Sequence, residues 1–463
     1  MVRAADFAAA SRPFRADVKI HDVEVEGVIP KELDGTSYRV VQDQYYDGSY
    51  YENGSKAIPF DGDGSVSAFR IKDGKVSFQQ KYVLTERLNP FTHHPCVRAV
   101  VDTSANTNVV VHANKLLAVS EGGPAYELDP NGLRTIGHAP FPDIHPTKAF
   151  TAHPHVDPET GLDSPNISIY IISRDGKLTY QRDIEFYPTG GMFHDCAITR
   201  NYIVLTRMPF TIDLKDLEKP GNHQWYYDEE CPAYFGLVPR DLKKPVRWFK
   251  HSDTTLASHN GLSFLPSRRG PNPEPKDVTV NHVKFCIDPN SESDELPDPE
   301  IVLRGPCEFP RIDERFLMSK TRITWLDCFN PNEDPTRQLF QGLNTLACVD
   351  YETGEVEYFS PSPICLVQEP AFSPRHPDAP EADGFLVTMV DNMELGRNEL
   401  IIQDKRDFQT VVAKVILPFR LRSAVHGNWV DATRIADAEP YEVQSFKDLY
   451  PIFRHFSSRS KVE

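Results

Sequence analysis

The sequence has no run of apolar residues that approaches the ~18 needed for a transmembrane helix. Its first twenty residues, MVRAADFAAASRPFRADVKI, also lack the continuous apolar segment of a secretory signal peptide. The eight cysteines form no CxxC pair and show no regular spacing, so neither zinc fingers nor a disulfide framework is expected. We therefore expect a soluble cytoplasmic protein whose cysteines are buried free thiols.

Basic residues are too few to balance the acidic ones. There are 50 lysines and arginines against 67 aspartates and glutamates, which gives a formal net charge of −17. Such a charge repels nucleic-acid phosphates and anionic membranes, so no nucleic-acid partner is expected. A small uncharged or apolar substrate fits better. The oligomeric state and a peripheral contact of apolar loops with a membrane stay open at this stage.

Helical periodicity is also scarce, and no repeat of fixed period is legible. What the chain has instead is a series of short β-rich runs between Gly, Pro, Asn and Asp residues. Examples are residues 67–71, 76–78, 108–111, 167–172 and 384–390. This rhythm predicts an all-β sandwich, barrel or propeller, and a propeller would need divergent blades. No linker divides the chain, so we expect one domain over residues 1–463, ordered over about 20–455.

Three histidines, far apart in the sequence, occupy similar short polar segments. They are His153 in AHPHVDPETG, His194 in FHDCAIT and His426 in HGNW. The runs 197–199 and 202–205 predict a hairpin, which places His194 at the start of a strand. One such histidine is more often structural, but three in similar settings suggest a common centre. Imidazole nitrogens suit iron, copper or zinc.

Three glutamates stand in comparable strand-and-turn settings. They are Glu121 in AVSEGGP, Glu308 in CEFPRI and Glu369 in VQEPAF. If all the ligands are neutral histidines, no ligand offsets the positive charge of the ion. Carboxylates that accept the free ring N–H of a ligand would supply that charge and fix the tautomer. For any one of these glutamates alone, a solvated surface carboxylate is the simpler interpretation.

Several motifs, taken in order, resemble the carotenoid cleavage oxygenase family. They include IPKELDGTSYRV, FDGDG, NTNVVVHANKLLAVSEGGPAYELDP, AHPHVDPETG, FHDCAIT, CEFPRI, QEPAFSPR and LPFRLRSAVHGNW. The resemblance extends from about residue 27 to 431. It implies an all-β fold, a seven-bladed β-propeller with a loop and helix dome over the iron-bearing face. It also implies non-haem Fe(II), held by four histidines on the propeller axis with three glutamates behind them.

The motifs carry these roles onto particular residues. His153, His194 and His426 match three ligands, and Glu121, Glu308 and Glu369 match the three carboxylates. The remaining ligand is expected about ten residues after a Trp-Phe pair, and His259 stands at nearly that distance from Trp248 and Phe249. The sequence departs from the family here, because Asn-Gly-Leu-Ser follows His259 in place of a glutamate-bearing motif. His251 and His282 are the alternatives for this ligand.

The implied reaction is the oxidative cleavage of a C=C bond by O2 into two carbonyl products, usually aldehydes. Two substrate classes compete, namely apocarotenoids or other conjugated alkenes, and phenolic stilbenes or related phenylpropanoids. The segments NPFT and LPFRLR resemble the stilbene-cleaving branch. That branch binds the phenol with a tyrosine and a lysine, and Arg87-Leu88 and Ser120 stand in their places. A non-phenolic alkene is therefore favoured.

Two further hypotheses come from other functional classes. The first is a propeller without activity that serves as a binding module, which the departure after His259 would explain. The second is a zinc hydrolase in which His153, His194 and His426 hold the metal and Glu369 acts as the base. The first predicts that no iron binds, and the second predicts activity that survives without O2.

Overall fold

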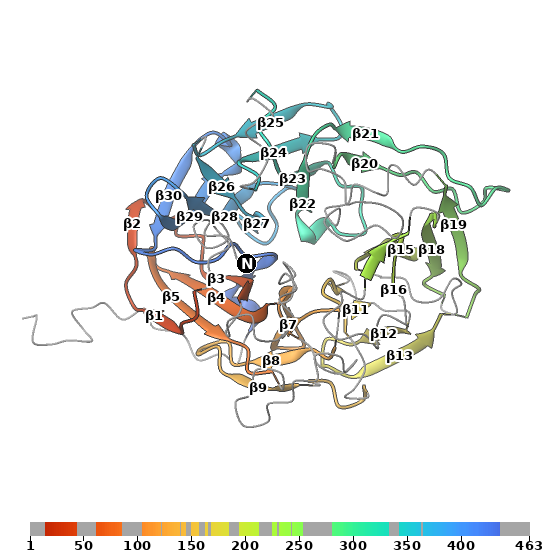
Figure 1. Ribbon diagram of the computed structural model, residues 1–463, viewed down its shortest axis with the longest axis horizontal. Coiled ribbons are helices and arrows are strands. Elements are labelled where there is room, and N and C mark those ends of the chain that lie inside the picture. The colour runs from red at the N-terminus through yellow and green to blue at the C-terminus, as the bar shows by residue number, and fades with distance from the viewer. Residues whose placement is uncertain are drawn as a thin grey trace, which may run out of the picture.

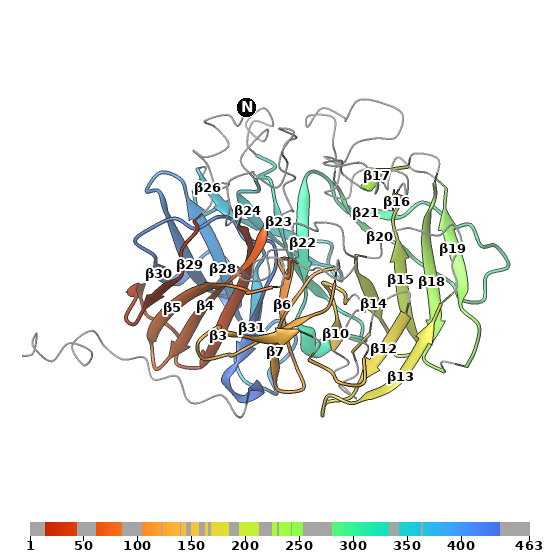
Figure 2. The same cartoon turned by 60° about the horizontal axis from the view of Figure 1, so that its bottom comes forward.

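The computed structural model of this chain describes residues 14–43, 62–85, 104–121, 123–138, 140–144, 150–156, 163–164, 168–184, 194–212, 225–228, 231–241, 243–252, 280–332, 342–362 and 364–435. The sheets in these segments lie in a ring around a central axis (Figures 1 and 2). Within them, helical structure is limited to three 3-10 turns: η3 (Glu314–Phe316), η5 (Lys405–Asp407) and η6 (Ala432–Arg434). The expected all-β propeller is therefore confirmed.

Two of the sheets combine strands from the beginning and the end of the described chain. The first has the order β1 (Val18–Ile20), β5 (Lys75–Tyr82), β4 (Asp63–Lys72), β3 (Gly35–Asp43) and β31 (Gly427–Asp431). The second has the order β2 (Glu24–Gly27), β30 (Val411–Ile416), β29 (Arg397–Asp404), β28 (Gly384–Asn392) and β26 (Cys365–Val367), and β27 (Ala371–Pro374) also pairs with β28. These pairings close the ring.

Four sheets are built from consecutive stretches of chain. One contains β6 (Asn108–His112), β7 (Lys115–Val119), β8 (Tyr126–Leu128) and β9 (Thr135–His138). The next contains β10 (His155–Val156), β11 (Asp163–Ser164), β12 (Ser168–Ile172) and β13 (Leu178–Asp183). A third contains β14 (Cys196–Ile198), β15 (Tyr202–Arg207), β18 (Ala233–Pro239) and β19 (Arg247–His251). The fourth contains β22 (Cys307–Arg311), β23 (Ile323–Cys328), β24 (Thr345–Asp350) and β25 (Val356–Phe359).

Two small sheets complete the described strands. They are β16 (Phe210–Ile212) with β17 (Trp225–Tyr227), and β20 (His282–Lys284) with β21 (Glu300–Leu303). The expectation of seven blades is therefore wrong, because the described segments form six sheets of four or more strands. A helical dome is not supported either, since these segments contain no α-helix. The blade number was inaccessible to the sequence alone, because the blades share no legible repeat and two of them mix strands from distant parts of the chain.

The hydrophobic core lies between neighbouring sheets. Phe69 and Phe78 of the first sheet pack in one buried cluster with Leu400 and Val415 of the second. Similar clusters join the other neighbours around the ring, so every shared face removes apolar surface from water. The predicted runs 67–71, 76–78, 108–111 and 384–390 fall within strands of this structure, and residues 168–172 of the remaining run form β12, while residue 167 lies outside the described residues. The predicted hairpin is formed by β14 and β15, with Ile198 opposite Ile203.

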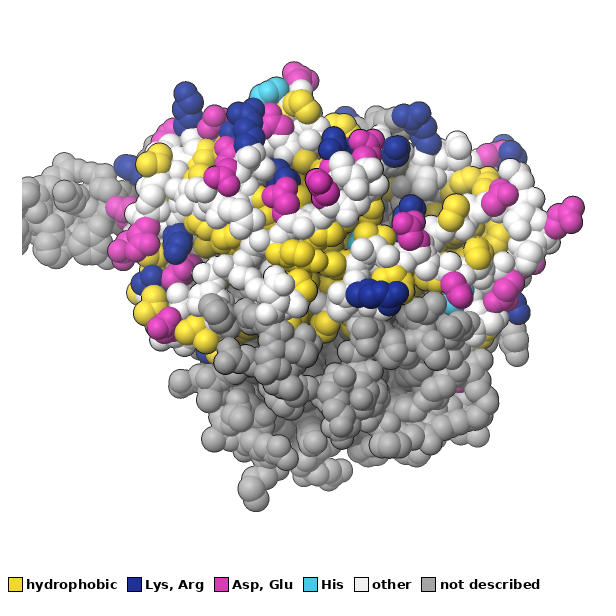
Figure 3. Space-filling view, turned by 90° about the horizontal axis from the view of Figure 1, so that it is seen from above, with side chains coloured by type: hydrophobic (Ala, Val, Ile, Leu, Met, Phe, Trp, Pro, Cys, Tyr) yellow, Lys and Arg dark blue, Asp and Glu magenta, His cyan; other side chains and the backbone are white. Residues whose placement is uncertain are grey.

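The surface mixes charged and apolar side chains. On the face shown in Figure 3, acidic and basic groups are interspersed around patches of hydrophobic side chains. Among the described residues, large apolar side chains that are strongly exposed include Val28, Leu84 and Leu395. In the same part of the chain, no helix has the length and hydropathy that would let it cross a lipid bilayer.

Candidate metal centre

Three histidines meet on the propeller axis. One ring nitrogen from each of His153, His194 and His426 lies within 4.8 Å of the other two. The ring centroid of His153 is 4.5 Å from that of His194 and 4.4 Å from that of His426. The chain segments that carry them are separated by 41 residues and by more than 200, so the ring of sheets is what brings them together.

Strand starts position these three side chains. His194 lies two residues before β14, and His426 lies immediately before β31. His153 lies in the segment that leads into β10, where its backbone N–H donates to Thr151 Oγ1 at 3.1 Å. Thr151 Oγ1 in turn donates to the backbone carbonyl of His194 at 3.4 Å. One threonine therefore ties two of the three histidine segments together.

Glu121 fixes the orientation of His194. The Nδ1 atom of His194 donates a hydrogen bond to Glu121 Oε1, which leaves the Nε2 lone pair directed at the centre. Burial alone would lower the pKa of His194, but Glu121 raises it above its ordinary value. Burial likewise acts to raise the pKa of Glu121, and the imidazoles of His194 and His153 lower it to about 2. Glu121 is therefore a carboxylate at neutral pH.

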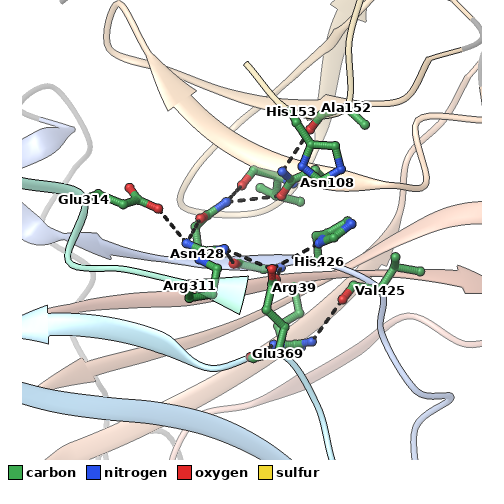
Figure 4. A network of polar contacts seen from close by, with 12 residues as sticks. Arg39, Asn108, Ala152, His153, Arg311, Glu314, Glu369, Val425, His426 and Asn428 are labelled. Carbon is green, nitrogen blue, oxygen red and sulfur yellow. Dashed lines mark hydrogen bonds and ion pairs between the residues drawn. The ribbon is translucent and has the colours of Figure 1, made fainter. Parts of the chain in front are cut away.

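Glu369 does the same for His426. The Nδ1 atom of His426 lies 3.1 Å from Glu369 Oε1, and the backbone N–H of Gly427 donates to Oε2 at 2.8 Å. Arg311 Nη1 lies 3.2 Å from Oε1 (Figure 4). Burial opposes ionisation of Glu369, but Arg311 and His426 hold its pKa well below the usual range. The buried, ionised carboxylate of Glu369 thus contacts Nδ1 of the His426 ring.

The donor set fits a metal ion. His153 Nε2 and His194 Nε2 are 3.1 Å apart. Two imidazole nitrogens that bind one ion at about 2.1 Å and at right angles lie about 3 Å apart. Burial, together with the neighbouring imidazoles of His426 and His194, lowers the pKa of His153 to about 3, so this ring is neutral as a ligand must be. Three imidazole nitrogen donors and two carboxylates form a site suited to a divalent transition metal.

Glu308 lies beside the centre without completing it. It belongs to β22, where the register with β23 shifts between Glu308 and Arg311. In this bulge Phe309 has a φ of 55° and its ring meets that of His426 edge-on at 5.3 Å. Within the described segments no hydrogen-bond partner faces the Glu308 carboxylate, and burial raises its pKa to about 7. The carboxyl is thus available to a group outside these segments.

The fourth predicted ligand, His259, lies outside the described residues. Its two alternatives are placed elsewhere and have other partners. His251 Nε2 lies 3.3 Å from Asp298 Oδ1, and His282 Nε2 lies 2.6 Å from the Tyr351 hydroxyl. Neither belongs to the group of converging histidines. The geometry therefore does not favour His251 or His282, and the ligand roles of all four predicted histidines stay predictions.

Comparison with known proteins decides the family. The profile of the retinal pigment epithelial membrane protein family (RPE65) matches residues 11–431. The chain belongs to this family of carotenoid cleavage oxygenases. The resemblance predicted from the motifs is thereby confirmed, as is the expected enzyme class, an alkene-cleaving dioxygenase.

This oxygenase is similar to proteins with different named substrates. It is 36% identical to resveratrol cleavage oxygenase 1 of Botryotinia fuckeliana, over 93% of this chain and 86% of that protein. It is 31% identical to carotenoid cleavage oxygenase 1 of Neurospora crassa, over 93% of this chain and 91% of that protein. The crystal structure of Pseudomonas brassicacearum lignostilbene dioxygenase superposes with a TM-score of 0.83 at 30% identity, covering 93% of this chain and 99% of that one.

Four polar residues of this oxygenase's centre were not found from the sequence. They are Arg39, Thr151, Arg311 and Asn428, which contact the backbone or the carboxylates around the histidines. Arg311 and Asn428 stand within the CEFPRI and HGNW motifs, three residues after Glu308 and two after His426. That proximity was a usable signal. Thr151 offered the same signal, because it lies two residues before His153. Arg39 is distant in sequence from every histidine of the group, and the pairing of β3 with β31 brings it to the site.

Gly427 offers a test of how tightly the centre is packed. A Cβ at this position would lie 2.4 Å from the backbone oxygen of Tyr38, so β31 must move away from β3. We expect Gly427→Ala to lower the free energy of unfolding by about 1–3 kcal/mol and to weaken metal binding, because His426 and the N–H to Glu369 move with the strand. Chemical denaturation and metal titration measure both effects. The control is Gly137→Ala, where a Cβ meets nothing within 4 Å; equal behaviour of the two variants would contradict the expectation.

Proposed function

We propose that this chain is a non-haem Fe(II)-dependent dioxygenase that cleaves a C=C bond of an apocarotenoid or another conjugated alkene into two aldehyde or ketone products. The observation that supports this most directly is the convergence of His153, His194 and His426, with a carboxylate on the Nδ1 of two of them. We further propose His259 as the fourth ligand and Glu308 as its carboxylate partner. The half-buried Glu308 carboxyl, which has no hydrogen-bond partner among the described residues, supports that assignment.

The reaction needs no organic cosubstrate. One C=C bond and one O2 molecule supply all the atoms of two C=O groups, so electrons and atoms balance. The bound iron supplies the redox chemistry that allows O2 to react with an alkene. The protein's part is to hold the iron with neutral rings, to offset its charge with Glu121 and Glu369, and to keep water out. The Phe309 ring against His426 places an apolar surface beside the ligands, where an alkene can lie.

The role of Glu369 argues against the zinc hydrolase. A hydrolytic base needs a carboxylate that faces the substrate and is able to accept a proton. Both Glu369 oxygens are instead engaged behind the histidine, by His426 Nδ1, the Gly427 N–H and Arg311. With a pKa well below the usual range, this carboxylate is also a weak base. The same buried ion pairs argue against a binding module without activity, since a scaffold has no need of them.

The second candidate substrate class is the phenolic stilbenes, which the names of the relatives favour. Ser120, buried beside Glu121, stands where the stilbene-cleaving branch is expected to have a lysine, and this favours a non-phenolic alkene. The test is to supply Fe(II) and O2 with apocarotenals, stilbenes and isoeugenol-type alkenes and to detect carbonyl products by mass. Two products in equal amounts from an apocarotenal or another non-phenolic alkene support the proposal. Cleavage of phenolic stilbenes alone supports the second candidate.

We also propose that residues 1–463 act as one domain in the cytoplasm. The described cysteines are all free, and six of the seven are buried, which suits a reducing compartment. The partners are the hydrophobic alkene and O2, without nucleic acid, and a peripheral membrane contact is one route by which such a substrate reaches the site. Separating lysed cells into cytosol and membranes and locating the protein by immunoblot tests this placement.

Replacing His259 tests the fourth ligand. We expect His259→Ala to weaken Fe(II) binding at least ~10-fold, because the site keeps three nitrogens and Glu308 loses its proposed partner. The measurement is anaerobic Fe(II) titration. His282→Ala is the control, since His282 contacts Tyr351 and lies outside the histidine group. Wild-type affinity in His259→Ala would remove His259 from the ligand set.

A further inference from the structure

The side chain of Asn428 links β31 to β6, which belong to different sheets. Its Nδ2 donates to the backbone oxygen of Val109 at 2.6 Å and to Asn108 Oδ1 at 3.2 Å. Asn108 Nδ2 then donates to the backbone oxygen of Ala152 at 2.9 Å (Figure 4). Ala152 directly precedes His153, and Asn428 lies two residues after His426. A chain of two amides therefore connects the segments of two ligands.

Arg311 joins this chain to the carboxylate behind His426. Its Nη2 donates to Asn428 Oδ1 at 2.7 Å, and its Nη1 donates to the backbone oxygen of Gly427 at 3.0 Å. The same Nη1 lies 3.2 Å from Glu369 Oε1. Only 15% of the Arg311 side chain and 4% of the Glu369 side chain are exposed. A buried cation thus contacts the anion that orients His426 and the amide that leads to His153.

The contacts that Asn428 and Arg311 make in this network are not part of the hydrogen bonding between paired strands. The backbone of β31 is already held by its ladder with β3, from Gly35 opposite Asp431 to Arg39 opposite Gly427. The contacts of Asn428 and Arg311 instead cross between β31, β6 and β22, which do not pair with one another. A network that crosses sheets fixes their relative placement, and here the sheets carry the ligands. The guanidinium of Arg311 carries several N–H donors in a rigid plane, so it fixes the directions of its hydrogen bonds in addition to supplying a positive charge.

We propose that Arg311 and Asn428 are positioning residues that hold His426 and His153 at the separation that one metal ion requires. This inference rests on the proposed function, because it needs a metal at the centre. Arg311 holds Glu369 directed at His426, and Asn428 links the position of β31 to the segment of His153. Loss of either residue leaves the ligands present but with their relative geometry relaxed.

The test uses variants that keep the ligands and their carboxylates. Asn428→Leu removes all three amide hydrogen bonds with the same number and branching of heavy atoms, whereas Arg311→Lys keeps the positive charge but removes the planar set of donors. The control is Glu314→Gln, which removes the charge of the exposed carboxylate 2.6 Å from Arg311 Nη2 and keeps every contact among Arg311, Asn428 and Glu369. Metal-free protein is titrated anaerobically with Fe(II) and, separately, with Co(II), whose visible spectrum reports ligand geometry.

We expect Asn428→Leu and Arg311→Lys each to weaken Fe(II) and Co(II) binding ~10- to 100-fold and to shift the Co(II) absorption bands. Glu314→Gln is expected to match the wild type in both measurements. If Asn428→Leu does not fold, Arg311→Lys decides the question alone. Unchanged affinity and an unchanged Co(II) spectrum in the folded variants would overturn the inference, even if thermal stability falls. That result leaves the proposed function intact, whereas a wild type that binds neither metal overturns both.

Discussion

Replacing His194 by alanine is expected to abolish iron binding and every carbonyl product. The variant loses the Nε2 atom that lies 3.1 Å from His153 Nε2, and the Glu121 carboxylate loses the ring that accounts for its low pKa. Without the His194 ring, burial favours the protonated form of Glu121. The negative charge that offsets the charge of the metal is then lost together with the ligand. Replacing a residue that only hydrogen-bonds to a ligand lowers metal affinity ~10- to 100-fold, and the loss of a ligand should exceed that range.

The measurement is iron content after anaerobic reconstitution, followed by product detection by mass. His376→Ala is the matched control, because this histidine is exposed and lies outside the histidine group. Circular dichroism and thermal unfolding of the metal-free proteins show whether both variants fold. A folded His194→Ala protein that still turns over the alkene would remove His194 from the centre.

Replacing Glu369 by glutamine is expected to damage both stability and metal affinity. Three donors converge on this carboxylate, namely His426 Nδ1, the Gly427 N–H and Arg311. A glutamine has one acceptor oxygen, and its NH2 group would face one of those donors. The change also removes the buried anion that Arg311 contacts and leaves this cation only its exposed partner, Glu314. Breaking a buried ion pair in this way costs about 3–5 kcal/mol in the free energy of unfolding.

Chemical denaturation of metal-free protein measures that loss, and Fe(II) titration should show an affinity ~10- to 100-fold weaker. Glu352→Gln is the control, because the Glu352 side chain is 50% exposed and pairs with Arg322 and Lys320 on the surface, each at 3.6 Å. Exposed pairs of this kind contribute at most ~1 kcal/mol. If the two glutamine variants unfold at the same denaturant concentration and bind iron equally, Glu369 has no special role.

The fold class was accessible from the sequence because each strand carries its own local pattern. Runs such as 108–111 and 384–390 alternate or are continuously apolar between turn residues, and both became strands. The number of blades was not accessible. The pairing of β3 with β31 and of β2 with β30 joins residues almost 400 positions apart, and nothing local to either strand encodes its partner.

The candidate site was accessible only in part. His153, His194 and His426 were chosen by motif, and the structure brings their rings together. The bonds from Glu121 to His194 and from Glu369 to His426 follow the expected pattern of carboxylates behind ligands. Arg311 and Asn428 were not predicted, since their importance depends on contacts between sheets. Polar residues that act across blades become visible only when the register of each sheet is known.

The proposed function depends on iron that binds at the histidine centre and allows O2 to cleave a conjugated alkene. The most direct measurement is to load the metal-free protein with Fe(II) under anaerobic conditions, determine bound iron, and then add alkene with and without O2. We expect about one iron per chain and two carbonyl products in equal amounts that form only when both iron and O2 are present. Absence of bound iron after reconstitution, or products that form equally well with zinc and without O2, would contradict it.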